Sequence, residues 1–376
     1  MNAQDDKRLA YIDSLRAIAA ILVLWVHVSE LYRHIGPAAI ATKWVNDLAV
    51  TISAGRMGVV AFFAISGFVV PFSIKLAHRH PVREFLLVRF FRLYPAYWLS
   101  IPLGAWALWL WNRPLTISEG LVNLTMLEYV FDVRPAIGLY WTLAVELVFY
   151  LCCAILVQMR AITNYRLIGM LVVAALAVQL LMFVLSRMKG LNAPYWLSMW
   201  LLNLSVMFWG TLYRANLRGE TRSRIDACFV WGIAFFFVVL YPIAVWMIGY
   251  SRAYSLGYSL GVLLFIVGTR VIRIEWRPLA WLGVISYSIY LFHPVVFSPV
   301  LHWMRHLPPD SWWRSWHLGS YVIAVLLLTI AFAAIVYRFV EKPGIELGRR
   351  LARRWFTGER DARRGDGLVP AASAAE

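Results

Sequence analysis

Asp13 to His27 reads DSLRAIAAILVLWVH, and this stretch decides how the rest of the chain is interpreted. It predicts an apolar helix with Arg16 near its start and His27 at its end. Because these two residues are eleven positions apart, they lie on nearly the same helix face, about 16 Å apart along the axis. Ionisable groups within an apolar span mark a functional site by default, and this pair indicates a polar cavity. The alternative is that Arg16 snorkels to the lipid headgroups and His27 lies in the membrane interface.

The composition is typical of a polytopic membrane protein. Of 376 residues, 61% are hydrophobic and only 15% are charged, and a soluble domain of this length cannot bury so much apolar surface. Ten apolar runs have, or nearly have, the length needed to cross a bilayer. We therefore predict an all-α protein in which ten runs are transmembrane helices: 12–31, 56–74, 90–111, 138–158, 166–186, 196–213, 227–249, 254–270, 280–304 and 319–340.

Lysine and arginine residues are distributed unevenly over the loops between these spans. Most of the 36 lie on the side that holds both termini, so the positive-inside rule predicts cytoplasmic termini. The formal charge of +16 is then a topology signal and a match to anionic membrane lipid, and we expect no nucleic-acid partner. Residues 1–345 form the predicted membrane domain, and residues 346–376 form a basic, partly disordered cytoplasmic tail.

Polar groups occur in the second span and at the cytoplasmic entry of the third. In the second span Gly67 follows Ser66, and such a small residue permits close helix packing or a break in the helix. Arg89 and Arg92 are three positions apart and share a helix face. Two guanidinium groups on one face suit phosphate recognition. The alternative is ordinary anchoring by positive charge at the cytoplasmic boundary.

The fourth span holds one carboxylate, Glu146, about 12 Å from its outer end. His27 lies at a compatible depth on a helix of opposite direction, and a buried carboxylate needs a partner. Glu146 could therefore orient the imidazole of His27 and stabilise its protonated form, as the orienting group of a general base does. The alternatives are a structural ion pair and a protonated glutamic acid that fixes helix packing.

The ninth and tenth spans add a second histidine and a second carboxylate. His293 precedes Pro294, and it either lines the same cavity or is a hydrogen-bonded helix residue beside a proline kink. Glu341, at the end of the tenth span, is most simply an interfacial anchor. Neither metal-ligand spacing nor a disulfide framework is formed by the three cysteines, Cys152, Cys153 and Cys228, so we expect no metal site.

Taken in this order, the motifs resemble those of the acyltransferase-3 family, polytopic enzymes that O-acylate carbohydrates and related hydroxyl compounds. The resemblance extends over roughly residues 10–345, and each motif is weak alone. The matching positions are Asp13, Arg16 and His27; Phe63 to Phe68; Arg89-x-x-Arg92 with Tyr94-Pro95; Trp141 to Tyr150 around Glu146; Ser286 to His293; and Glu341-Lys342-Pro343. Thr142 and Val284 stand where Ser and Lys are common in the family, and neither change removes a proposed catalytic group. The chain is similar to stand-alone members without an esterase-like domain.

The resemblance implies acyl transfer from a cytoplasmic acyl-CoA, expected to be acetyl-CoA, to a hydroxyl of an extracytoplasmic or lipid-linked glycan. Arg89 and Arg92, assisted by Arg16, would hold the CoA phosphates. His27 would act as general base with Glu146, or it would carry the acyl group itself. Possible cavity-lining residues are Asp13, Ser66, Trp141, Tyr287 and His293. The resemblance implies no permanently bound cofactor and a multi-pass protein of the cytoplasmic (inner) membrane.

Three other functions remain open at this level. The acceptor could be a small secondary metabolite, such as a macrolide sugar, instead of a glycan. A secondary transporter could use buried Arg, His and Glu side chains as a proton relay, although no pair of broken spans marks corresponding halves of the chain. A non-catalytic membrane scaffold would leave the buried ionisable groups without a role.

Overall fold

The computed structural model describes residues 9–33, 40–189, 195–221, 223–247, 252–308 and 310–356. Within these ranges the regular structure is helical and no strand occurs, which confirms the predicted all-α class. Its helices are α1 (Ala10–Tyr32), α2 (Ile40–Thr51), α3 (Ala54–Val69), η1 (Pro71–Ser73), α4 (Pro81–Leu110), α5 (Ile117–Asn123), α6 (Tyr140–Gln158), α7 (Tyr165–Lys189), α8 (Tyr195–Leu217), α9 (Arg224–Phe235), η2 (Phe236–Leu240), α10 (Tyr241–Met247), α11 (Arg252–Arg270), α12 (Arg277–Val284), α13 (Ser286–Arg305), η3 (Trp312–Ser315), α14 (Leu318–Val336), η4 (Tyr337–Glu341) and α15 (Lys342–Phe356).

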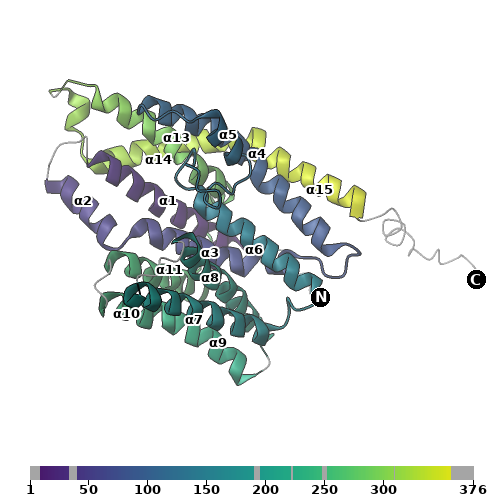
Figure 1. Ribbon diagram of the computed structural model, residues 1–376. Coiled ribbons are helices and arrows are strands. Elements are labelled where there is room, and N and C mark those ends of the chain that lie inside the picture. The colour runs from purple at the N-terminus through teal and green to yellow at the C-terminus, as the bar shows by residue number, and fades with distance from the viewer. Residues whose placement is uncertain are drawn as a thin grey trace, which may run out of the picture.

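The helices form a bundle with α1, α3 and α6 in its middle (Figure 1). Helices α7 to α11 lie together on one side of this centre, and α4, α5, α13, α14 and α15 lie on the other side. Helix α1 packs against α3, α12, α13 and α14. The stretch around Arg16 and His27 is therefore surrounded by other helices, and the centre of the bundle is where a cavity can form.

Seven helices in the described ranges are long and apolar enough to cross a membrane, or eight if the pair α12 and α13, bent by 71°, is one span. Each of the ten predicted runs is mostly helical where the structure describes it, but α4 and α8 are not among the seven. Helix α8 is less apolar because it carries buried polar residues such as Asn203 and Thr211. Helix α4 begins at Pro81 with a charged turn and contains Arg89 and Arg92. Helix α2 lies in the segment predicted to be the first outer loop.

Small residues allow the central helices to approach closely. A Cβ atom at Gly67 of α3 would overlap the carbonyl oxygen of Met207 of α8, and one at Gly210 would overlap the carbonyl oxygen of Ala64. The hydroxyl of Thr211 donates to the Gly67 carbonyl across this crossing, over 3.0 Å. Of the two roles considered for Gly67, the structure supports close packing, since α3 continues unbroken to Val69.

Helix α15 continues from α14 through the π-helical turn η4 and packs along α4. A Cβ atom at Gly348 would lie 2.6 Å from Cβ of Phe91. The helix therefore crosses the predicted domain boundary at residue 345, while residues 357–376 of the predicted tail lie outside the described ranges.

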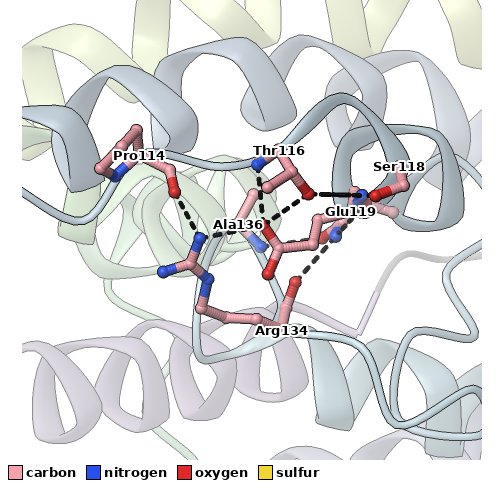
Figure 2. Close-up of polar contacts among 7 residues, drawn as sticks. Pro114, Thr116, Ser118, Glu119, Arg134 and Ala136 are labelled. Carbon is pink, nitrogen blue, oxygen red and sulfur yellow. Dashed lines mark hydrogen bonds and ion pairs between the residues drawn. The ribbon is translucent and has the colours of Figure 1, made fainter.

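The segment between α5 and α6 is held by a compact set of hydrogen bonds (Figure 2). The Arg134 guanidinium donates to the Pro114 carbonyl over 2.5 Å and to Glu119 over 3.0 Å. Thr116 and Glu119 form a capping box at the start of α5. The buried Asn123 side chain donates to the carbonyls of Glu119 and Arg134 and accepts from the N–H of Ala136. These bonds fix the segment that leads into the first turn of α6.

Candidate active site

Two cavities follow one another along α1, the first beside Arg16 and the second beside His27. The first, called here the arginine cavity, has an empty volume of about 620 Å³ including its open mouth. Its lining residues are Arg16, Val59, Phe62, Phe63, Ser66, Arg92, Leu93, Thr142, Leu143, Glu146, Ser286, Tyr287 and Tyr290. The second, the histidine cavity, has an empty volume of about 590 Å³ and is lined by Val23, Val26, His27, Glu30, Ser53, Gly55, Arg56, Val59, Leu139, Trp141 and Tyr290.

The two cavities meet at Val59 and Tyr290, which line both of them. The Tyr290 hydroxyl is 2.9 Å from Oγ1 of Thr142. Because Thr142 donates its own proton to the carbonyl of Leu139, Tyr290 is the donor in this bond. The tyrosine is therefore fixed between α13 and α6 at the junction of the cavities.

Helix direction explains which residues face which cavity. Helix α1 enters at the arginine cavity with Arg16 and reaches the histidine cavity with His27. Helix α6 runs the opposite way, so Trp141 in its first turn lines the histidine cavity and Glu146 the arginine cavity. Helix α3 also runs opposite to α1, which takes Ser66 into the arginine cavity. The helix face of α1 that carries Arg16 and His27 thus contributes one ionisable residue to each cavity.

The arginine cavity places two guanidinium groups among apolar, hydroxyl and carboxylate side chains. Arg16 is paired with the buried Asp13 over 3.5 Å. Arg92 also lines the cavity, and the carboxylates of Glu146 and Glu341 interact with it electrostatically. Glu146 is the one carboxylate in the lining, and it accepts a hydrogen bond from Tyr150 over 2.5 Å. A guanidinium that faces a confined space can bind an anionic ligand with charge-assisted hydrogen bonds.

Arg89 lies outside the cavity, although the sequence predicts that it acts together with Arg92. Its side chain is buried and donates to Oγ of Ser73 over 2.7 Å. The guanidinium carbon lies 5.5 Å from the centre of the Phe85 ring and 5.3 Å from that of Tyr150. These contacts hold η1 against α4, so the Arg89 side chain stabilises helix packing. Arg92, in contrast, faces the arginine cavity.

The histidine cavity combines aromatic and charged groups around His27. The Arg56 guanidinium lies 4.1 Å from the centre of the Tyr254 ring and 5.6 Å from that of Trp141. Glu30 follows His27 by three positions and lines the same cavity. Polar hydrogen-bonding groups beside an aromatic ring are suited to a polyhydroxyl ligand.

His27 pairs with His293, and the expected contact with Glu146 is corrected by the structure. Nδ1 of His27 is 2.9 Å from Nε2 of His293, whereas Glu146 lines the other cavity and is bonded to Tyr150. Similar depth on antiparallel helices does not determine which side chains meet, because helix rotation and neighbour order also decide it. His293 is fully buried behind His27 and, like Asp13, lies outside the lining of both cavities.

Two residues line the site without having been expected there, and a third, Glu341, is buried in the bundle outside both cavity linings. Glu341 is buried and accepts a hydrogen bond from Ser288 over 2.6 Å, so its expected role as an interfacial anchor is wrong. Arg56 and Glu30 line the histidine cavity. The sequence contains a signal for both, since Arg56 is the charge at the start of the second span and Glu30 lies on the face of His27.

The sequence profile of the acyltransferase-3 family, described as "Acyltransferase domain", matches residues 9–338. The chain belongs to this family. Both cavities are built from residues within the matched range. The protein is therefore an acyltransferase and an integral, multi-pass membrane protein, as predicted.

Three named proteins are similar to this acyltransferase-3 chain. "Nodulation protein 10" of Rhizobium leguminosarum bv. viciae is 25% identical over 389 residues, covering 91% of this chain and 95% of that protein. "Putative membrane-bound transacylase BcsY" of Komagataeibacter xylinus is 24% identical, covering 90% and 83%. "Putative peptidoglycan O-acetyltransferase YrhL" of Bacillus subtilis (strain 168) is 23% identical, covering 94% and 57%. No solved structure matches the chain.

Proposed function

We propose that the protein transfers an acyl group, expected to be acetyl, from acyl-CoA to a hydroxyl of an extracytoplasmic or lipid-linked glycan. The donor approaches from the cytoplasmic side through the arginine cavity, and the acceptor occupies the histidine cavity. The observation that carries this proposal is the adjacency of the two cavities along one face of α1, with Arg16 in the lining of one, His27 in that of the other, and Val59 and Tyr290 in both. The names of the similar transacylase and O-acetyltransferase support the reaction class.

The proposal requires a defined topology. Ten spans, with α4 and α8 added to the more apolar helices, give both termini a cytoplasmic location in the inner membrane. The arginine cavity then opens toward the side where acyl-CoA is made, because α1 enters the bilayer there. The basic residues of α15 lie on the same side, next to anionic lipid headgroups.

The chemistry follows from the positions of the charged groups. Arg92 and Arg16 bind phosphate oxygens of the donor, and its extended thiol arm passes Val59 and Tyr290 toward His27. The imidazole of His27 takes the proton of the acceptor hydroxyl. The acceptor oxygen forms a bond to the thioester carbonyl carbon while the carbon–sulfur bond breaks, and the departing thiolate takes the proton back from His27.

The two neighbouring arginines provide a matched test of donor binding. Arg92→Lys keeps the charge but removes the two-pronged donor set. We expect it to raise the KM for acyl-CoA about tenfold or more, since hydrogen bonds to charged groups contribute about 1.5–3 kcal/mol. The KM for the glycan acceptor should remain unchanged. Steady-state kinetics of the purified protein in lipid nanodiscs measures both constants.

Arg89→Lys is the matched control, because Arg89 has the same charge one helical turn away and faces Ser73 instead of the cavity. It should leave the KM for acyl-CoA unchanged. The proposal fails if wild-type protein shows no saturable binding of acyl-CoA, or if the two substitutions raise this KM equally.

A further inference from the structure

The His293-Pro294 pair determines where a proton sits on the second histidine. Pro294 has no N–H, so the carbonyl of Tyr290, four positions earlier, lacks its usual helical partner. Nδ1 of His293 lies 2.7 Å from this carbonyl oxygen and 3.3 Å from that of Ile289. A carbonyl oxygen only accepts hydrogen bonds, and Nδ1 of His293 therefore carries the proton.

This proton in turn determines the tautomer of His27. A neutral imidazole with a proton on Nδ1 has a bare Nε2, so Nε2 of His293 accepts, and Nδ1 of His27 donates, in the bond that joins them over 2.9 Å. The ring planes differ by only 7° and the ring centres are 5.2 Å apart. Because the two nitrogens are much closer than the ring centres, the rings meet edge to edge, which suits the direction of a nitrogen lone pair.

The Nε2 atom of His27 is therefore unprotonated and has a free lone pair. Its Nδ1 edge is covered by His293, which is fully buried. The opposite edge of the ring is the part that can reach the histidine cavity, which His27 lines and His293 does not. A general base and an acyl-carrying nucleophile both need this bare nitrogen.

We propose that His293 is a positioning residue that fixes the reactive tautomer of His27 and stabilises it in the protonated state. This inference rests on the proposed function. When the acceptor O–H gives its proton to Nε2 of His27, the Nδ1–H of the resulting imidazolium remains bonded to Nε2 of His293. The proton leaves Nε2 again with the thiolate, so His293 gains and loses nothing over the cycle.

A neutral partner is consistent with the surroundings of His27. A carboxylate usually has this orienting role, but Glu146 lies in the other cavity. A buried, neutral histidine avoids the free-energy cost of burying a second charge. The carbonyl freed by Pro294 then replaces the carboxylate as the group that orients the histidine pair.

The tautomer can be measured independently of activity. Wild-type protein with ¹⁵N-labelled histidine is reconstituted in lipid at alkaline pH, and the His27 signals are assigned by their loss in His27→Ala. Solid-state NMR should show a protonated Nδ1 and a bare Nε2 on His27. A protonated Nε2 on His27 would overturn the proposal.

Kinetics tests the consequence with two substitutions of similar size. His293→Leu removes the acceptor for His27, and we expect kcat to fall about a hundredfold or more while the KM for acyl-CoA stays unchanged. His293→Gln keeps an oxygen acceptor and should recover most of that loss. His302→Leu, on the same helix but outside both cavities, is the control and should retain full turnover.

Equal losses in the Leu and Gln variants, or near-normal turnover in both, would overturn the proposal. The two failures remain distinguishable. If wild-type protein transfers no acyl group, the proposed function is wrong, while the NMR experiment still decides whether His293 fixes the tautomer of His27.

Discussion

Glu128 is a carboxylic acid fully buried in the segment between α5 and α6. Neither of its carboxyl oxygens has a hydrogen-bond partner in the described part of the chain. The nearby Tyr97 hydroxyl donates to the carbonyl of Asn123. Burial raises the pKa of Glu128 from 4.5 to about 7. Titratable groups that interact with it are phenols: Tyr94, Tyr97, Tyr129 and Tyr140.

This raised pKa predicts a stability that declines with pH. Well below pH 4.5 the Glu128 carboxyl is protonated in both the folded and the unfolded state. Its contribution to the free energy of unfolding is therefore fully present at such pH values. The contribution is lost as pH rises to about 7, because the unfolded state ionises first. Glutamine cannot ionise, so Glu128→Gln does not lose this stability. The free energy of unfolding of Glu128→Gln, relative to that of wild type, should therefore rise by roughly 3 kcal/mol between pH 4.5 and about 7. Thermal unfolding of both proteins in detergent, at a series of pH values, measures this difference.

Glu119 of the preceding helix, α5, is a control whose pKa is shifted in the opposite direction. The hydrogen bond from the Thr116 N–H, with Arg134, holds the pKa of Glu119 below its ordinary value. Glu119→Gln should therefore cause a loss of stability at neutral pH that shrinks as pH falls through that lowered pKa. A Glu128→Gln difference that stays constant with pH would contradict the account of Glu128.

A single residue of the candidate site can be predicted from the sequence when its residue type is unusual for its position, as an ionisable residue is within an apolar span. Arg16 and His27 are unusual in an apolar span, and both line a cavity as expected. Their partners are not predictable in this way. The sequence gives no helix rotation, so it could not show that His27 meets His293, or that Arg89 turns to Ser73.

At the scale of elements, the crossing of α3 and α8 determines where the cavity walls stand. Ser66 of α3 lines the arginine cavity, and its neighbour Gly67 packs against the backbone of α8. Such crossings of small residues are a main source of helix association in membranes. The position of one wall therefore depends on the absence of a side chain at Gly67.

Gly67→Ala should destabilise the protein strongly, because its methyl group would overlap the carbonyl oxygen of Met207. Backbone atoms cannot move aside as a flexible side chain can, so we expect a loss of at least about 2–3 kcal/mol. Gly232→Ala in α9 is the matched control, since no atom lies within 4 Å of its added methyl group; alanine there should be neutral or stabilising by up to about 1 kcal/mol. Unfolding midpoints in detergent measure both, and equal midpoints would contradict the packing account.

The helices themselves are largely predictable from apolar runs, but their irregular turns are not. Each of the ten runs is mostly helical where the structure describes it, yet η4, the π-helical turn at Tyr337–Glu341, has no counterpart in hydrophobic periodicity. An extra residue in such a turn changes the direction of the side chains that follow. Glu341 therefore points to Ser288 inside the bundle, although its position in the sequence suggested an anchor at the membrane surface.

For the whole molecule, the central feature is a pair of neighbouring, chemically different cavities that share Val59 and Tyr290 in their walls. The arginine cavity is suited to an anionic donor, and the histidine cavity combines a proton acceptor with aromatic and polar groups. A transporter with a proton relay would also place ionisable groups inside the bundle, but it would not need a binding site for acyl-CoA. The account therefore depends on whether donor and acceptor react while they are on opposite sides of the membrane.

Reconstituted vesicles test this most directly. Protein inserted in one orientation, with a glycan acceptor inside the vesicles and radiolabelled acetyl-CoA added outside, should transfer label to the enclosed glycan. His27→Ala vesicles, prepared in the same way, should transfer none. Label that appears only when donor and acceptor share one compartment, or no label on the glycan in either arrangement, would contradict the account.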